Sequence, residues 1–175
     1  MSIVSKIGMT LSAVAILCSL AGCGYRLTNS PPQRLAAGQS VWVPFITNET
    51  ISPTAQTVLR RALYDELHAL RGLRAADSEA VADLIVSGRL SAYNIRAVSY
   101  SAVDRARGFS LLLEVELAIR SRSETVPFWK GALQGSKEYP GNSDLALQRN
   151  AEERALDAAA RTIARRFISA TEQSY

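Results

Sequence analysis

The residue with the most distinctive chemical context is Cys23, whose thiol can be modified covalently. It follows Leu20-Ala21-Gly22 and an apolar run of 13 residues, 7–19. Lys6 precedes this run and is the only charged side chain before Arg26. A positive start, a short apolar core and small residues at its end are typical of a secretory signal peptide. The run is too short for a transmembrane helix, which needs about 20 apolar residues.

The stretch from Leu20 to Cys23 also resembles the lipobox of bacterial lipoproteins. The resemblance implies cleavage after Gly22, diacylation of the Cys23 sulfur and acylation of the new N-terminus. A buried N-terminal helix is the alternative, but it leaves Lys6 and the small-residue ending unexplained. We therefore expect a lipoprotein signal peptide over residues 1–22, a lipidated N-terminus and tether over 23–37, and a single α/β sandwich domain over 38–175.

The composition limits the remaining chemistry. Cys18 lies in the expected signal peptide and Cys23 is the expected lipid carrier, so we expect neither a disulfide nor a thiolate metal site in the mature chain. Of the 20 basic residues 17 are arginine, whose planar guanidinium suits phosphate and carboxylate groups. An anionic partner is therefore allowed, although a mild positive charge is also typical of solvated surface. Export makes nucleic acid an unsuitable partner.

No arrangement of residues in the sequence is typical of an enzyme. His68 is the only histidine, and no free cysteine, glycine-rich phosphate loop or nucleophile-elbow serine accompanies it. Glu114 and Glu116 lie two apart on one expected strand, but exposed neighbours offer no burial that would shift a pKa. We expect no enzyme, no metal and no cofactor.

The residues after the tether predict a strand and then an amphipathic helix. Residues 40–46 are rich in β-branched and aromatic side chains, and Pro44 favours an edge position or a bend there. Ser52 and Pro53 predict the N-cap and the first position of a helix, and Gly72 predicts its end. The expected apolar face comprises Leu59, Leu63 and Leu70, flanked by Ala55, Ala62 and Leu67.

Three strands follow, each with a period of two. In the first, Leu84, Val86, Gly88, Leu90 and Ala92 are expected on one face, and Ile85, Ser87, Arg89, Ser91 and Tyr93 on the other. The second places Leu111, Leu113, Val115, Leu117 and Ile119 on one face. Residues 128–139 return as the other arm of an antiparallel hairpin, with Lys130, Gln134 and Glu138 expected opposite Glu116 and its neighbours. Gly131 and Gly135 predict the close approach of a helix, or a bulge.

A long terminal helix completes the pattern, capped by Asn142 or Ser143. Its expected apolar stripe comprises Leu145, Leu156, Ala159, Ala160, Ile163, Phe167 and Ala170. Arg149 and Glu152 interrupt the stripe, so we expect this end of the helix to overhang the core. Two amphipathic helices can bury their stripes on the one apolar face of a single sheet. The predicted fold is α+β: a two-layer sandwich of about four mainly antiparallel strands with two helices packed on one face, in the order β-α-β-β-β-α.

The whole mature chain resembles the LptE family of lipopolysaccharide (LPS)-assembly lipoproteins. The resemblance is carried by Cys23-Gly24-Tyr25-Arg26-Leu27, Val41-Trp42-Val43-Pro44-Phe45, the proline-opened helix, Ser87-Gly88-Arg89-Leu90, the alternating strand 111–120, Phe128-Trp129 and Ala151-Glu152-Glu153-Arg154-Ala155. It implies an outer-membrane lipoprotein that plugs the LptD β-barrel, helps to deliver LPS to the outer leaflet and binds LPS. Only Cys23 is carried over from the family residue by residue.

The polar face of the expected sheet supplies candidate contacts. Antiparallel sheets often expose such a face to water, but the polar lumen of a membrane barrel would also accept it. LPS phosphates would attract basic residues that lie near aromatic ones. The candidates for contact with LPS or a partner are Arg89, Tyr93, Arg96, Arg105, Arg107 and Lys130. Ordinary solvated surface is the alternative for each of them.

Two other function classes remain open from the sequence. One is a lipoprotein that activates a periplasmic enzyme, such as a cell-wall synthase. The other is a lipid carrier of the lipoprotein-sorting type, which needs a deep apolar cavity and more than the four expected strands. The protein that co-purifies with the chain would discriminate between the barrel plug and the activator.

Overall fold

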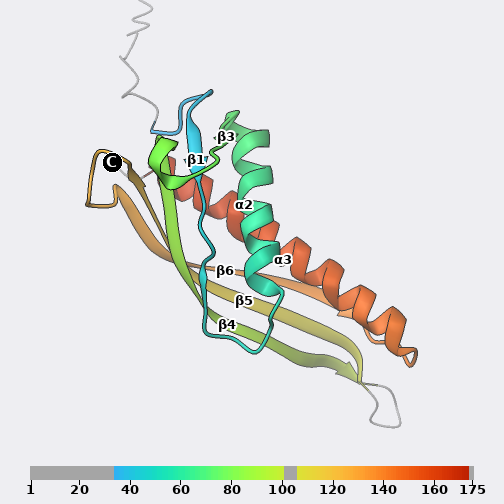
Figure 1. Cartoon of the computed structure of the whole chain (residues 1–175). Helices are drawn as coiled ribbons and strands as arrows, with labels where there is room; N and C mark the ends of the chain where they lie inside the picture. Colours follow the sequence, from blue (N-terminus) through green and yellow to red (C-terminus); the bar gives the residue numbers. More distant parts are fainter. Residues whose placement is uncertain (1–33, 101–105, 174–175) are drawn as a thin grey trace, which may run out of the picture. The chain divides into compact units, whose positions relative to one another are not determined.

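The computed structural model describes residues 34–100 and 106–173, in which two helices pack on one face of a mixed sheet (Figure 1). The elements are β1 (Ser40–Trp42), β2 (Thr47–Asn48), α2 (Ala55–Arg71), β3 (Arg74–Ala75), the 3-10 helix η1 (Glu79–Val81), β4 (Leu84–Tyr100), β5 (Ala106–Ser121), β6 (Trp129–Pro140) and α3 (Leu145–Gln173). The expectations for Cys23 and Arg105 lie outside the described residues.

The sheet has the strand order β3-β1-β4-β5-β6, and β2 also pairs with β4. The long strands β4, β5 and β6 are antiparallel, whereas the short strands β1, β2 and β3 pair in parallel. The predicted α+β sandwich with both helices on one face is confirmed, but the sheet has six strands rather than about four. Pro44 cannot donate to a ladder, and the first expected strand accordingly divides into β1 and β2. The residue pair Arg74–Ala75 adds the short strand β3.

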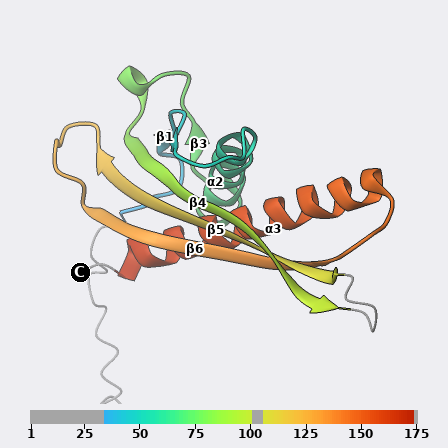
Figure 2. The same ribbon diagram turned by 90° about the horizontal axis from the view of Figure 1, so that it is seen from below.

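The core lies between the helices and the apolar face of β5. Leu111, Leu113 and Leu117 are at most 1% exposed, which confirms the predicted alternation. Opposite them lie fully buried side chains of both helices, among them Leu59, Leu63, Ile163 and Phe167. Figure 2 shows that α3 extends along the sheet well beyond the end of α2.

The alternation of β4 changes phase at a β-bulge. Leu90 pairs with Val115 and Ala92 with Glu114, so Ser91 is an extra residue in β4. One extra residue moves every later side chain to the opposite face. Tyr93 therefore pairs with the buried Leu113 and lies on the helix side, whereas Ala92 lies on the open side. The predicted faces of Ala92 and Tyr93 were wrong for this reason.

The predicted start of α2 and one of its core residues were also wrong. The helix begins at Ala55 after an N-cap at Thr54, two residues later than Ser52 and Pro53 predicted. The predicted end is confirmed, because Gly72 adopts φ +65° and caps the helix in the left-handed region. Leu70 is 51% exposed, because the buried Leu73 fills the core just after this turn.

The terminal helix α3 is capped by Asp144 rather than by Asn142 or Ser143. The Asp144 carboxylate accepts hydrogen bonds from the backbone N–H groups of Ala146 (2.8 Å) and Leu147 (3.2 Å). This is the standard way to satisfy the free donors of a first turn. Leu145 was predicted in the buried stripe but is 76% exposed, since this end of α3 extends beyond the core.

Candidate partner-binding face

The open face of the sheet carries the ion-paired cation Arg89. Its Nη2 donates to Glu116 Oε1 at 3.0 Å and its Nη1 to Glu49 Oε1 at 3.4 Å. The hydrogen bond with Glu116, and then the charges of both carboxylates, raise the pKa of Arg89 above its ordinary value. The charge of Arg89 is therefore already neutralised within the domain.

The other two open-face candidates, Lys130 and Arg96, lie far from each other. Lys130 pairs with Ala118 and Arg96 with Ser110, whereas Glu116 faces Ala132. Lys130 thus lies opposite Ala118, the next residue after Glu116 on the same face of β5, and is a diagonal neighbour of Glu116. The β5 positions 110 and 118 are about 26 Å apart at roughly 3.3 Å per residue. Lys130 and Arg96 thus cannot hold a single phosphate group together.

Tyr93 links the sheet to α3 instead of contributing to the open face. Its hydroxyl donates to Glu152 Oε1 at 2.5 Å. Burial raises the pKa of Tyr93 well above its ordinary value, and the hydrogen bond to Glu152 raises it further. Glu152 interrupts the apolar stripe of α3 because it meets this hydroxyl, a partner that the sequence pattern did not reveal.

The remaining candidate, Arg107, lies near the start of β5 and is exposed. Ser99 pairs with Gly108 and Tyr100 with Ala106, so Arg107 is an extra residue at a bulge in β5 and has no partner in the ladder that would place it on the open face. Of the five candidates within the described ranges, only Arg89, Arg96 and Lys130 lie on the open face. The structure thus divides the candidate set between two faces.

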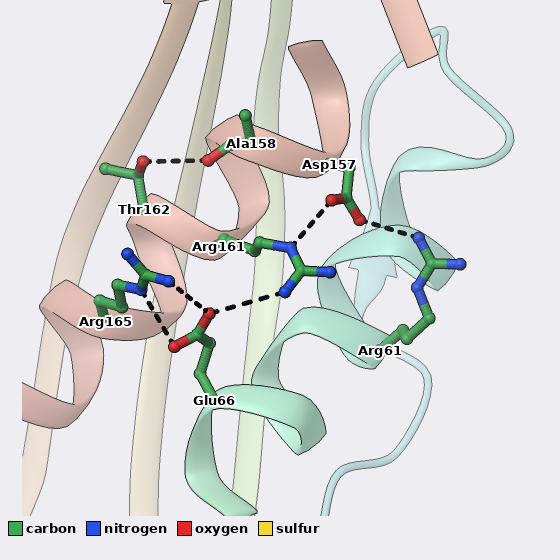
Figure 3. A network of polar contacts seen from close by, with 7 residues as sticks. All are labelled: Arg61, Glu66, Asp157, Ala158, Arg161, Thr162 and Arg165. Carbon is green, nitrogen blue, oxygen red and sulfur yellow. Dashed lines mark hydrogen bonds and ion pairs between the residues drawn. The ribbon is translucent and has the colours of Figure 1, made fainter. Parts of the chain in front are cut away.

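Sequence reasoning missed a polar network that joins α2 to α3 (Figure 3). Glu66 is only 4% exposed and accepts two hydrogen bonds from Arg165, at 3.0 and 3.1 Å. Arg161 lies 3.8 Å from Glu66 and also donates to Asp157, which in turn accepts from Arg61 at 2.9 Å. These hydrogen bonds, that from Arg161 first, hold the pKa of Asp157 below its ordinary value. The four-residue spacing of Asp157, Arg161 and Arg165 was the available clue in the sequence.

The histidine and the metal-ligating side chain types were the remaining groups to place. His68 is exposed, and its Nδ1 lies 3.0 Å from the Leu73 carbonyl oxygen. Within residues 34–100 and 106–173 there is no group of three or more metal-ligating side chains. Over the same ranges, no helix combines the length and apolar character that a membrane crossing requires. The described domain is thus a helix-covered core beneath an open polar sheet face.

Comparison with known proteins identifies the family. Residues 38–171 match the LptE family, described as lipopolysaccharide-assembly, and the chain therefore belongs to it. No curated protein matches the chain. The predicted membership in the LptE family is confirmed.

Solved structures show the same fold at low sequence identity. The hypothetical protein CT253 from Chlamydia trachomatis has a TM-score of 0.53 and 11% identity, covering 79% of this chain and 98% of its own. Protein XCC0632 from Xanthomonas campestris has a TM-score of 0.52 and 12% identity, covering 82% and 92%. The PelC dodecamer from Paraburkholderia phytofirmans has a TM-score of 0.50 and 19% identity, covering 81% and 93%.

Proposed function

We propose that this protein is a non-enzymatic outer-membrane lipoprotein, anchored through Cys23, that occupies the lumen of an LptD-type β-barrel. There it assists barrel assembly and the delivery of LPS to the outer leaflet. The observation that carries the proposal is the open sheet face, which is polar and charged along β4, β5 and β6. Barrel lumens are polar, so a polar sheet face can lie against the lumenal wall without bringing polar and apolar surfaces together. Membership in a lipopolysaccharide-assembly family supports the same role.

The dimensions of the domain support a position within the barrel. β4 has 17 residues, which at roughly 3.3 Å each gives a length of about 56 Å. The apolar band of an outer-membrane barrel is about 25 Å tall. At one end of the sheet Arg34 Nη1 donates to the Phe128 carbonyl at 2.9 Å, and the guanidinium lies over the Phe128 ring. The far end of β4, at Tyr100, lies at the opposite end of the sheet from this contact, and we propose that it extends through the barrel.

Co-purification tests the proposed function. Full-length protein extracted from outer membrane in detergent is expected to retain a large, heat-modifiable β-barrel in a stoichiometric complex. A Cys23→Ser variant is the matched control for the anchor, because its folded domain is unchanged but the lipid site is lost. Recovery of the wild-type protein with a cell-wall synthase and without a barrel would instead favour the activator of a periplasmic enzyme.

Within this function, Lys130 and Arg96 are the candidates for direct contact with LPS phosphate. Both are exposed, and no ion pair to either exists among the described residues, whereas Arg89 is paired twice. We expect Lys130→Gln to weaken LPS binding about tenfold, because a hydrogen bond to a charged group contributes about 1.5 kcal/mol or more. Arg89→Gln is expected to change it less than about twofold, since its charge is neutralised internally.

The measurement is binding of purified LPS to the detergent-solubilised protein, with circular dichroism to verify folding. Arg96→Gln tests the other unpaired candidate, at the distant end of the open face. Equal binding by the Lys130 and Arg89 variants, with retained folding, would assign Lys130 to ordinary solvated surface.

A further inference from the structure

A second feature of the described surface is a cluster of three aromatic rings around Arg60 of α2. The Arg60 guanidinium carbon lies 5.0 Å from the centroid of Phe45, 5.3 Å from Tyr64 and 5.7 Å from Trp42. All three rings are within the range of cation–π attraction. We call these four residues the Arg60 cluster. It lies where the chain passes from β1 to β2, at the edge of the sheet beside α2.

The local backbone holds the Arg60 cluster in place. Arg60 Nε donates to the Val43 carbonyl at 2.6 Å, and the Val43 N–H donates to the Tyr64 hydroxyl at 2.9 Å. Pro44 follows and has a fixed φ and no N–H, so this segment cannot continue the ladder of β1. These contacts therefore fix the orientation of the Arg60 side chain through its Nε atom and do not use its two terminal nitrogens.

The chemistry of the cluster is that of a protein–protein contact. Neither terminal nitrogen of Arg60 has a hydrogen-bond or ion-pair partner among residues 34–100 and 106–173, whereas Arg89 and Arg165 both meet carboxylates. Phe45 is 68% exposed although it is a large apolar side chain. Tryptophan, tyrosine and arginine dominate the energetics of interfaces, and a guanidinium binds a carboxylate through two parallel hydrogen bonds.

We propose that the Arg60 cluster binds a carboxylate side chain on the lumenal wall of the barrel subunit; this inference rests on the proposed function. Inside a barrel, the edges of a two-layer domain face the wall. The Arg60 cluster lies at one of these edges, between β1 and β2. The lumenal wall of a barrel is polar, and a carboxylate is the polar group that best complements a guanidinium with two free terminal nitrogens. The exposed Phe45 ring covers the resulting ion pair from water, which strengthens it.

The test is photo-crosslinking from position 47, whose exposed side chain lies two residues from Phe45. A photoreactive amino acid replaces Thr47 in the full-length lipoprotein, and the complex is isolated from irradiated cells. We expect a covalent adduct with the barrel, mapping close to an aspartate or glutamate of its lumen. Phe45→Ala and Arg60→Gln are each expected to lower the adduct yield at least fivefold, and Arg154→Gln, at an exposed arginine of α3, is the matched control.

Phe45→Ala keeps the inference testable if Arg60→Gln lowers stability, since Phe45 is largely exposed. A barrel that co-purifies but forms no adduct from position 47 would overturn the inference and leave the proposed function intact. An adduct on LPS, or a yield unchanged in both variants, would also overturn it. If the wild-type protein carries no barrel at all, the proposed function itself fails.

Discussion

Replacement of Gly135 by valine is expected to lower the free energy of unfolding by about 3 kcal/mol, the upper end of overpacking effects. Gly135 of β6 lies directly against α3. A Cβ atom added there would collide with the Ala159 carbonyl oxygen, which is backbone, and would lie 3.0 Å from Ile163 Cγ1. Neither atom belongs to a flexible side-chain end, so α3 has to move away from the sheet. Urea unfolding followed by circular dichroism measures the loss.

Gly131 provides the control on the same strand. The nearest atoms to a Cβ at Gly131 belong to the Trp129 indole ring, at 2.9 Å and beyond, and not to any backbone. Because a side chain can shift, Gly131→Ala is expected to cost less than about 1 kcal/mol, the low end of overpacking effects. Equal losses for Gly135→Val and Gly131→Ala would show that the approach of α3 does not govern the site.

The two glycines also show what the sequence pattern was able to predict. A glycine in a strand predicts that something approaches closely, and this is correct for Gly135. The pattern does not reveal the approaching group, which is a helix backbone at Gly135 and the neighbouring indole at Gly131. The period of two in β5 was predictable because every second side chain faces a continuous apolar layer.

The bulge at Ser91 marks the limit of such patterns. The side chains of residues 84–93 alternate as they would in a regular strand, and neither glycine nor proline flanks the extra residue, Ser91. Only pairing with β5 decides where the ladder shifts, and that pairing is non-local. Tyr93 was therefore assigned to the open face, although it meets Glu152 on the helix side.

The candidate cations were predictable as residues, but their states of pairing were not. Arg89 and Lys130 carry the same charge on the same face, yet two carboxylates meet Arg89. One of these is Glu49, which lies 40 residues away in sequence and approaches because β2 pairs with β4. The Arg60 cluster was hidden for the same reason, since Trp42 and Arg60 are neighbours only after β1 and α2 pack together.

Removal of Arg165 is the second change expected to lower the free energy of unfolding strongly. Removal of its partner, Glu66, is expected to have a different effect. In Arg165→Ala the buried Glu66 carboxylate loses both of its hydrogen bonds and retains only Arg161, at 3.8 Å. Loss of one partner from a fully buried pair costs about 3–5 kcal/mol. The Arg165 side chain is 64% exposed, so water screens the pair and we expect a loss of about 2 kcal/mol.

Glu66→Leu is expected to be much less harmful, because it leaves no buried charge behind. Arg165 and Arg161 are 64% and 43% exposed and regain their hydration when the carboxylate is absent. An apolar side chain of similar size in place of a buried ion is often neutral or stabilising, so a change within about 1 kcal/mol is expected. The exposed Arg154 is the matched control, and Arg154→Ala should change stability by less than about 0.5 kcal/mol. If Glu66→Leu destabilises the domain more than Arg165→Ala does, the attraction between the ions, and not the desolvation of the carboxylate, dominates the contact between α2 and α3.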